Sequence, residues 1–441
     1  MPAIARDADV VVIGGGIAGL TSALELAENG RRVILLEARE RLGGRIHTVR
    51  PAGWPIPIEL GAEFVHGGND AFWRMARRTR LAVEKVSPHH WVRTAREIGS
   101  EPDLQGRIAR VTSQIHPRKA GNMSFAGYFR KHPFKGDPRD WQIASEFVEG
   151  FEAAPRDQIS ARSLAGVSFE EEKQFRVPRG YDTLVTAVAR MAAARGVDIR
   201  LNQEVKMIRW RRGEVTVEST AAGHVASVHA STAIITLPIG VLQSSSGRPA
   251  VRFAPELSAL RALVRRMGIG HVFRLNLRFT SSAWRTLRRP PLDGRGPLGF
   301  LHSSTRPMSV WWSLSDHPVL VGWSGGPAAV ALGRQSLRAR IRRAIAALGS
   351  LCQQSPAFLA SHLAGAIEHD WTRDPFARGA YSFIGAGPDH AAAELATPIE
   401  RTLFFAGEAT APSNEVGTVH GALASGLRAA REVNAVMRQR K

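Results

Sequence analysis

The sequence predicts an α/β protein with more than one domain, and three observations support that prediction. The first forty residues alternate apolar, strand-like runs with a helical stretch and a glycine-rich turn. Residues 403–409, close to the other end of the chain, form another apolar run that leads to a glycine and an acid. The chain has 441 residues, of which 44% are hydrophobic and 22% are charged, which is enough for two or three domains with substantial cores.

The N-terminal stretch has the order of a dinucleotide-binding βαβ unit. Apolar runs at 9–13 and 32–36 predict two strands, and helical periodicity at 20–27 predicts a helix between them. The turn GGGIAG at 14–19 joins the first strand to the helix. A glycine turn also arises for steric reasons alone, so the prediction rests on the complete order of strand, turn, helix, strand and acid.

The residues of this unit have separate tasks. Gly14 permits the tight turn, Gly16 lets the backbone approach a pyrophosphate, and Gly19 allows the helix to pack against the strand. The helix N-terminus offers unpaired N–H groups and a positive dipole end to the phosphates. Glu37 ends the second strand, where its carboxylate can accept hydrogen bonds from the adenosine ribose hydroxyls.

A second glycine pair follows this acid directly, in the stretch ARERLGGRIHT at 38–48. A nicotinamide-dependent enzyme has no need of a second phosphate-contacting loop at this point. Together with Glu37, the stretch resembles the FAD signature of the flavin-containing amine oxidase family, which includes monoamine oxidases, polyamine oxidases, L-amino acid oxidases and histone lysine demethylases. The resemblance implies bound FAD, with contacts from Arg39, Gly43, Gly44 and Arg45.

Stretches near the C-terminus extend the resemblance over nearly the whole chain. Residues 371–382 resemble the family's tryptophan-to-tyrosine stretch. After Gly407, the carboxylate of Glu408 can hold a ribityl or phosphate-side hydroxyl. The N–H groups near Thr418 and Val419 open the final helix and point at the flavin pyrimidine ring, where the helix dipole favours negative charge.

The wide separation of these signatures predicts a discontinuous FAD domain. We expect a Rossmann-type FAD-binding domain and a substrate domain of mixed sheet plus helices. Within the first, the resemblance places the backbone of Val205 at the adenine end. Within the second, 70–176 has helix-like patterning without long β-branched runs and is predicted to be mostly helical. The predicted FAD-binding segments are 1–69, 177–246 and 397–441, and the substrate-binding segments are 70–176 and 247–396.

The resemblance also suggests residues on the reacting side of the flavin. The stretch GAEFVHG at 61–67 passes beside the flavin ring in the family, which implies that His66 lies near flavin and substrate. The alternative is a histidine that is hydrogen-bonded in a loop without a chemical role. Residues 147–154 (FVEGFEAA) could line a pocket, but helix-packing aromatics are the commoner explanation, and we assign them no role.

The aromatic walls that enclose an amine in the family are half present. Tyr381 matches one wall, whereas Thr418 stands where monoamine oxidases place the other tyrosine. Two such walls favour amines through π contact, so the loss of one weakens the case for a simple arylalkyl amine. Ala380 stands where monoamine oxidases attach FAD through cysteine, which predicts non-covalent FAD.

The chain departs from the family at a lysine that other members bind through a water to flavin N5. The matching position is Arg274, and no lysine lies between Lys206 and Lys441. Arginine keeps a positive charge near the flavin but cannot act as a neutral amine. The change therefore bears on oxygen reactivity more than on hydride transfer. Arg274 could equally be a structural ion-pair residue.

Composition narrows the class of protein further. The formal net charge is +20, but the arginines are spread along the chain, so we expect a solvated surface and no nucleic-acid partner. Cys352 is the single cysteine, which excludes a disulfide framework and a multi-cysteine metal site, and we predict no metal. The first ten residues lack an apolar signal-peptide core and no apolar run could span a bilayer, so we expect a cytoplasmic protein.

We therefore expect an FAD-dependent oxidoreductase that takes a hydride from a C–N bond of an amine or amino acid. Oxygen is the expected acceptor and hydrogen peroxide the product, with His66, Arg274 and Tyr381 on the reacting side. One alternative is a desaturase or dehydrogenase of a hydrophobic substrate with another acceptor. A second is a non-catalytic flavin-bearing binding protein that meets nucleic acid or membrane through its positive charge.

Overall fold

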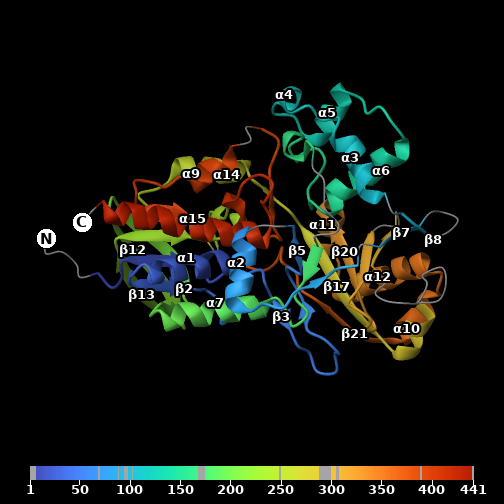
Figure 1. Ribbon diagram of the computed structural model, residues 1–441, viewed down its shortest axis with the longest axis horizontal. Coiled ribbons are helices and arrows are strands. Elements are labelled where there is room, and N and C mark those ends of the chain that lie inside the picture. The colour runs from blue at the N-terminus through green and yellow to red at the C-terminus, as the bar shows by residue number, and fades with distance from the viewer. Residues whose placement is uncertain are drawn as a thin grey trace.

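The computed structural model has two lobes side by side along its long axis (Figure 1). A smaller group of helices between residues 104 and 150 stands above the second lobe in that view. The fold is α/β with mixed sheets, as predicted. The structure describes residues 6–67, 70–87, 89–93, 98–101, 103–166, 174–247, 250–287, 299–303, 307–387 and 390–439.

The first lobe is built on a five-stranded parallel sheet. The strands come from three separate stretches of chain. In order across the sheet they are β10 (Asp198–Arg200), β2 (Val33–Leu36), β1 (Val10–Ile13), β14 (Thr232–Ile235) and β23 (Leu403–Phe405). Every residue of the four strands β2, β1, β14 and β23 is buried, because helices cover one face of the sheet and a second sheet covers the other. Burial on both faces explains why these strands are continuous apolar runs in the sequence.

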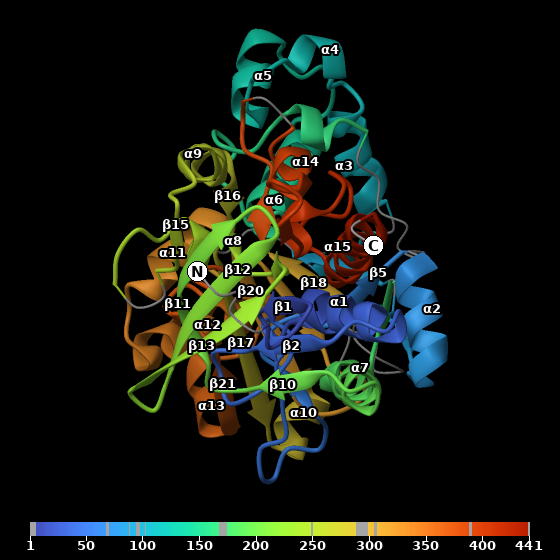
Figure 2. The ribbon, with the colours of Figure 1, turned by 90° about the vertical axis from the view of Figure 1, so that its left-hand side faces the viewer.

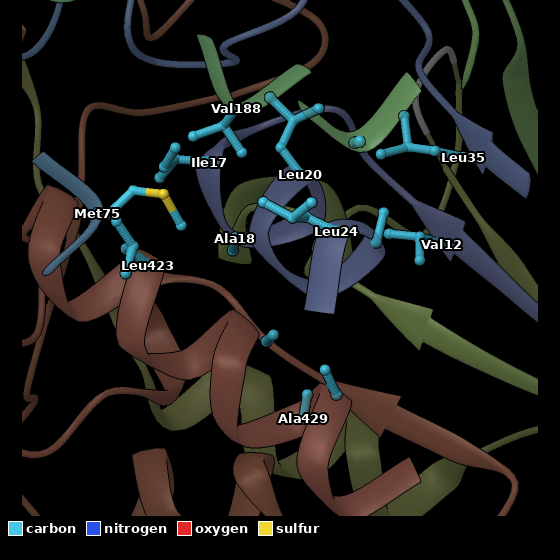
Figure 3. Close-up of a cluster of buried hydrophobic side chains, with 14 of the residues drawn as sticks. Val12, Ile17, Ala18, Leu20, Leu24, Leu35, Met75, Val188, Leu423 and Ala429 are labelled. Atoms are coloured by element: carbon cyan, nitrogen blue, oxygen red, sulfur yellow. The ribbon is translucent and has the colours of Figure 1, made fainter. Parts of the chain in front are cut away.

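Helices cover one face of this sheet and a second sheet covers the other. Val10 and Val12 of β1 pack with the helices, and Val11 and Ile13 pack with the second sheet. Figure 2 shows β1 and β2 between these two layers, and Figure 3 shows the helix-side core around Leu24. The helices are α1 (Ile17–Glu28), α7 (Asp182–Ala194) and α15 (Val419–Arg438); the second sheet has the order β13 (His224–Ala230), β12 (Glu214–Ala221), β11 (Glu204–Arg211) and β15 (Arg252–Ala254).

Helices α1 and α15, from the two ends of the chain, touch at a glycine. A Cβ atom on Gly426 would lie 2.3 Å from the Ala18 carbonyl oxygen, so only glycine permits this approach. The Ser22 hydroxyl donates a hydrogen bond to the Gly426 carbonyl oxygen at 3.1 Å. The C-terminal helix is thereby fixed against the helix that begins at the glycine turn.

The second lobe is built on a seven-stranded sheet. All neighbouring strands are antiparallel except β18 and β7. Helices α10 (Ser281–Leu287), α11 (Gly326–Gly333), α12 (Leu337–Cys352) and α13 (Pro356–Ser361) supply the core that covers one face. In order across the sheet the strands are β21 (Leu363–Glu368), β17 (Val272–Phe279), β20 (Val319–Gly325), β19 (Val310–Ser313), β18 (Phe300–Ser303), β7 (His90–Arg93) and β8 (Ile98–Ser100).

The group of helices above the second lobe has its own core, to which Phe125 and Val148 belong. Its longest helix begins at Pro138, and the Asp137 side chain caps that end by accepting a hydrogen bond from the Arg139 N–H at 2.9 Å. The helices are α3 (Leu104–Thr112), α4 (Pro117–Ala120), α5 (Phe125–Lys131) and α6 (Pro138–Gly150).

The structure of 70–176 differs from the mostly helical prediction. Residues 104–150 are helical, but β7 and β8 join the large sheet, and β6 (Glu84–Lys85) and β9 (Gln174–Arg176) pair with β5 (Phe64–His66). Helix α2 (Asp70–Thr79) buries Phe72, Met75 and Ala76 in the core of the first lobe. These three positions lie on one face of α2, and that face packs in the same core as α15.

Short elements connect the lobes and the sheets. They are β3 (Thr48–Val49), β4 (Ile58–Glu59), η1 (Arg162–Leu164), α8 (Ile239–Leu242), α9 (Ser258–Arg266), β16 (Gly268–Ile269), β22 (Ser382–Phe383), α14 (Ala391–Ala396) and η3 (Glu408–Thr410). Within the described part of the chain, no helix combines the length and apolarity that a bilayer span requires.

Candidate active site

A cavity of 1450 Å³ runs from the first lobe to the second. At one end it is lined by the glycine turn after β1 and by the ends of β2 and β23. At the other end it is lined by α3, α6 and the large sheet. One continuous space therefore joins the predicted dinucleotide site to the predicted substrate domain.

The glycine turn has the geometry that a pyrophosphate requires. Gly14 adopts φ +108°, and a Cβ atom on Gly19 would lie 1.9 Å from the Gly14 carbonyl oxygen, so the turn and the helix need glycine at both positions. A Cβ atom on Gly16 would meet nothing within 4 Å, and Gly16 lines the cavity. The backbone at Gly16 is thus open to a ligand at the N-terminus of α1.

Glu37 lies at the same end of the cavity and is buried. Its carboxylate accepts a hydrogen bond from the Gly15 N–H at 2.6 Å and another from the Arg39 N–H at 2.9 Å. Burial raises the pKa of Glu37 and outweighs these hydrogen bonds, which act in the opposite direction. The carboxylate stabilises the glycine turn; its contact with a ribose stays a prediction.

The two FAD signatures, far apart in sequence, meet through two ion pairs. Arg39 makes a bidentate pair with Asp374, at 2.6 and 2.9 Å. Burial acts to raise the pKa of Asp374, but the hydrogen bonds from His369 and Arg39 outweigh it and hold that pKa well below its usual range. Arg45 pairs with Glu408 at 2.7 Å.

Glu408 also organises the start of α15. Its carboxylate accepts a hydrogen bond from the Ser382 hydroxyl and one from the Gly417 N–H, the latter at 3.0 Å. The Thr418 hydroxyl caps α15 by accepting a hydrogen bond from the Gly421 N–H at 3.0 Å. The structure brings the remaining predicted cofactor residues to the cavity wall as well: Gly43, Gly44, Val205, Gly407 and Val419.

His66 ends β5 and lines the cavity between the two lobes. Among the described residues, its Nδ1 atom is buried without a hydrogen-bond partner. Burial lowers the pKa of His66 to about 4, and the neighbouring His420 acts in the same direction. The imidazole is therefore neutral near pH 7.

Arg274 lies on β17 in a buried ion pair. Its guanidinium donates to Glu63 at 2.6 Å and to the Gly61 carbonyl oxygen at 3.3 Å, and it lies over the Trp312 ring at 5.6 Å. Glu63 also accepts a hydrogen bond from the Trp312 Nε1–H at 3.1 Å. Both charged side chains are only 4% exposed. Arg274 was predicted either as a positive charge beside the flavin or as a residue of a structural ion pair. The geometry shows the ion pair, and it lies at the cavity wall.

Tyr381 also lines the cavity, and its hydroxyl is already engaged. The hydroxyl donates to the carbonyl oxygen of Phe151, the residue that follows α6. Burial is the main cause that raises the pKa of Tyr381, and the nearby Glu152 adds to it. The hydroxyl is therefore a neutral structural donor, and the ring remains available as a wall of the cavity.

A cluster of aromatic rings lines the substrate end of the cavity, together with aliphatic and polar side chains of α3 and α6. Phe64 lies 5.7 Å from Phe300 and 5.4 Å from Trp312, and Phe300 stacks on His90 at 5.2 Å, measured between ring centroids. His90 shares a hydrogen bond of 2.8 Å with His302. Burial lowers the pKa of His302 to about 3, and His90 acts in the same direction.

Sequence reasoning missed several residues at this site. Glu63 and Asp374 pair with predicted arginines, and Phe151 and Glu152 belong to the stretch to which we assigned no role. Their partners lie far away in sequence, so no local pattern marks them. Among the described residues no group of three or more His, Cys, Asp or Glu side chains could hold a metal ion.

A protein family and several curated proteins are similar to this chain in sequence. A family model described as flavin containing amine oxidoreductase matches residues 17–120 and 123–434. Polyamine oxidase 3 of Oryza sativa subsp. japonica is 28% identical over 464 residues, which cover 96% of this chain and 88% of that protein. Lysine-specific histone demethylase 1 homolog 2 of the same organism is 27% identical over 97% of this chain and 57% of that protein.

Solved structures show a similar fold. Putrescine oxidase, in its wild-type form bound to putrescine, is 22% identical with a TM-score of 0.78, covering 97% of this chain and 99% of that chain. Cyclohexylamine oxidase from Brevibacterium oxydans IH-35A is 18% identical with a TM-score of 0.79, covering 98% of this chain and 100% of that chain. At these identities the likeness is one of fold.

Proposed function

The chain belongs to the family of flavin-containing amine oxidoreductases, and from this premise we propose that it oxidises a C–N bond of a small amine, with oxygen as the final acceptor and hydrogen peroxide as the product. The observation that carries the proposal is the continuous cavity, which joins the glycine turn to His66, Tyr381 and the aromatic rings of the second lobe.

FAD fits the nucleotide end of this cavity. Gly16 leaves room for phosphates at the N-terminus of α1, and Glu37 stands at the end of β2 for the ribose. When bound, FAD accepts a hydride from the carbon beside the substrate nitrogen. The N–H groups at the start of α15 present a positive dipole end to the cavity. The methyl side chain of Ala380 has no nucleophilic atom for covalent attachment, which supports non-covalent binding.

The lining of the cavity favours an amine over an amino acid. A substrate carboxylate calls for a guanidinium that is free to bind it. Each arginine at the cavity wall already donates to a carboxylate or a carbonyl of the protein. These arginines are Arg39, Arg45, Arg139, Arg162 and Arg274.

His66 and Tyr381 would position the amine. A neutral His66 at the cavity wall can accept a hydrogen bond from an amine N–H. The Tyr381 ring forms an apolar wall, and the rings of Phe64 and Trp312 help to exclude water from the chamber. Relatives named polyamine oxidase and structures named putrescine and cyclohexylamine oxidase make such amines the first substrates to try.

The test is the visible spectrum of the purified protein during anaerobic mixing with separate pools of polyamines, diamines, cyclic amines and L-amino acids. We expect an amine pool to bleach the flavin band and the amino-acid pool to leave it unchanged. On admission of air, the band should return with one hydrogen peroxide per turnover. A flavin band that no amine bleaches would contradict the proposal, and bleaching that air does not reverse would contradict oxygen as acceptor.

A second measurement tests the attachment of the cofactor. Acid precipitation of the protein should leave the flavin in the supernatant, where chromatography would identify it as FAD. Flavin that remains in the precipitate would contradict non-covalent binding.

A further inference from the structure

The segment that follows α6 carries a carboxylate without a partner. Glu152 lines the cavity, and among the described residues it has no hydrogen-bond or ion-pair partner. Two glutamates on α6 itself are engaged. Glu149 pairs with Arg156 at 2.9 Å, and Glu146 accepts a hydrogen bond from Gln142 at 3.0 Å.

Contacts from two other segments hold the backbone on either side of Glu152. The Trp323 Nε1–H donates to the Gly150 carbonyl oxygen at 3.0 Å, and the Tyr381 hydroxyl donates to the Phe151 carbonyl oxygen. A Cβ atom on Gly325 would lie 2.1 Å from the same Gly150 oxygen, so the two backbones are in direct contact. The position of Glu152 is therefore determined by the packing of β20 and of the segment around Tyr381.

The residue after Glu152 adopts a backbone conformation that non-glycine residues rarely use. Ala153 has φ +53° and is buried. Its Cβ atom is so close to Gly270 that a Cβ atom added to that glycine would lie 3.0 Å away. Such conformations persist only where the surroundings over-determine them, and they cluster at active sites. The bend leaves Glu152 at the cavity wall near the Tyr381 hydroxyl.

From this geometry we propose that Glu152 binds the ammonium form of the substrate and takes one proton from its nitrogen. One N–H bond of the ammonium breaks, its proton passes to a carboxylate oxygen of Glu152, and the electron pair stays on nitrogen. The neutral amine then remains beside the Tyr381 ring. This inference rests on the proposed function, and it assigns the proton-accepting role to a carboxylate rather than to Arg274 or to the neutral His66.

The charges around Glu152 suit this role. Tyr381 and His66 are both neutral near pH 7, and residues 319–326 of β20 and the start of α11 carry no charged side chain. Glu149, on α6, is paired with Arg156. Burial raises the pKa of Glu152 to about 7. Transfer of an ammonium from water into an aromatic chamber lowers the pKa of the ammonium. The pKa values of the proton donor and of the acceptor Glu152 therefore lie closer together.

The test uses the FAD-loaded protein and an amine that cannot be oxidised. The probe is tert-butylammonium, which has no hydrogen on the carbon that bears the nitrogen, and tert-butanol is its uncharged counterpart. Binding is followed by the change in the flavin spectrum and by calorimetry. For the wild type we expect a preference for the ammonium probe and an affinity that rises about tenfold from pH 6 to pH 8, as a group with a pKa near 7 ionises.

Three variants decide the inference. Glu152→Gln should lose both the ammonium preference and the pH rise, and Glu152→Asp should keep the rise at lower affinity. Glu149→Gln removes the same charge three residues earlier, outside the cavity wall, and should behave like the wild type. A Glu152→Gln protein with the wild-type pH rise would overturn the inference. If the Glu152→Gln protein does not retain FAD, a Glu152→Asp protein whose affinity for the ammonium probe does not rise with pH would overturn the inference instead.

The outcome is separable from that of the proposed function. A wild-type protein that amines bleach, with probe binding unaffected by Glu152→Gln, would overturn the role of Glu152 and leave amine oxidation standing. A wild-type protein that no amine bleaches, with probe binding that depends on Glu152, would overturn amine oxidation and leave Glu152 as a site for organic ammonium ions.

Discussion

Replacement of Glu63 by glutamine tests the buried ion pair at the cavity wall. The pair is short, at 2.6 Å, and both side chains are 4% exposed. Glu63→Gln leaves the Arg274 charge buried with two longer hydrogen bonds, to Gly61 and Asn276, each at 3.3 Å. Removal of one partner from a buried pair costs about 3–5 kcal/mol, because the remaining charge is uncompensated. We expect the lower end of that range, since the two carbonyl oxygens still accept from the guanidinium.

Urea unfolding of the FAD-loaded proteins, followed by tryptophan fluorescence, measures this effect. The matched control is Glu214→Gln, which breaks the Arg211–Glu214 pair at the same 2.6 Å but with side chains that are 78% and 41% exposed. An exposed pair contributes at most about 1 kcal/mol. The double variant Glu63→Leu with Arg274→Met removes both charges and should recover most of the loss. If Glu63→Gln shifts the unfolding midpoint no more than Glu214→Gln does, burial is not the source of the energy.

Three further changes test other parts of the structure. Valine at Gly19 would place a Cβ atom 1.9 Å from the Gly14 carbonyl oxygen, so Gly19→Val should lose bound FAD, measured as flavin absorbance per protein, whereas Gly333→Ala should keep it because its Cβ position is open. The pKa of His302 is lowered from 6.5 to about 3, so between these values the unfolded chain binds a proton that the folded chain does not. Stability falls as the pH falls through this window, and His302→Phe should flatten the dependence of the urea midpoint on pH; an unchanged slope would refute the assignment. Tyr381→Phe leaves a carbonyl oxygen without its donor and should lower the unfolding free energy by about 1–3 kcal/mol, measured in urea.

The first lobe could be predicted from sequence because its determinants are local. The strand, glycine turn, helix, strand and acid lie within forty residues, and each has the φ angle, burial or apolar run that its task requires. Parallel strands buried on both faces also stand out as continuous apolar runs. The discontinuity of this lobe followed from a second set of signals of the same local kind, at residues 403–426.

The substrate end could not be predicted in the same way because its determinants are tertiary. Glu63 and Arg274 are 211 positions apart, and nothing in either local sequence marks them as partners. The role that we infer for Glu152 depends on a turn that Trp323 and Tyr381 hold in place. Residues 70–79 were predicted as part of a substrate-binding segment, whereas helix α2 packs in the core of the first lobe, because periodicity shows that a helix has an apolar face but not which core receives it.

The packing of α15 on α1 also has a consequence for biosynthesis. Strand β1 ends at Ile13, whereas β23 and α15, which complete the sheet and its helical layer, begin at Leu403 and Val419. At roughly 5–20 residues per second, a ribosome needs roughly 20–80 s to make the intervening chain. Throughout that interval the apolar strands of the glycine-turn unit lack β23 and α15, which complete their sheet and one of its covering layers in the folded protein. A message truncated before codon 403 would yield a protein that cannot assemble the nucleotide site, however intact its first forty residues.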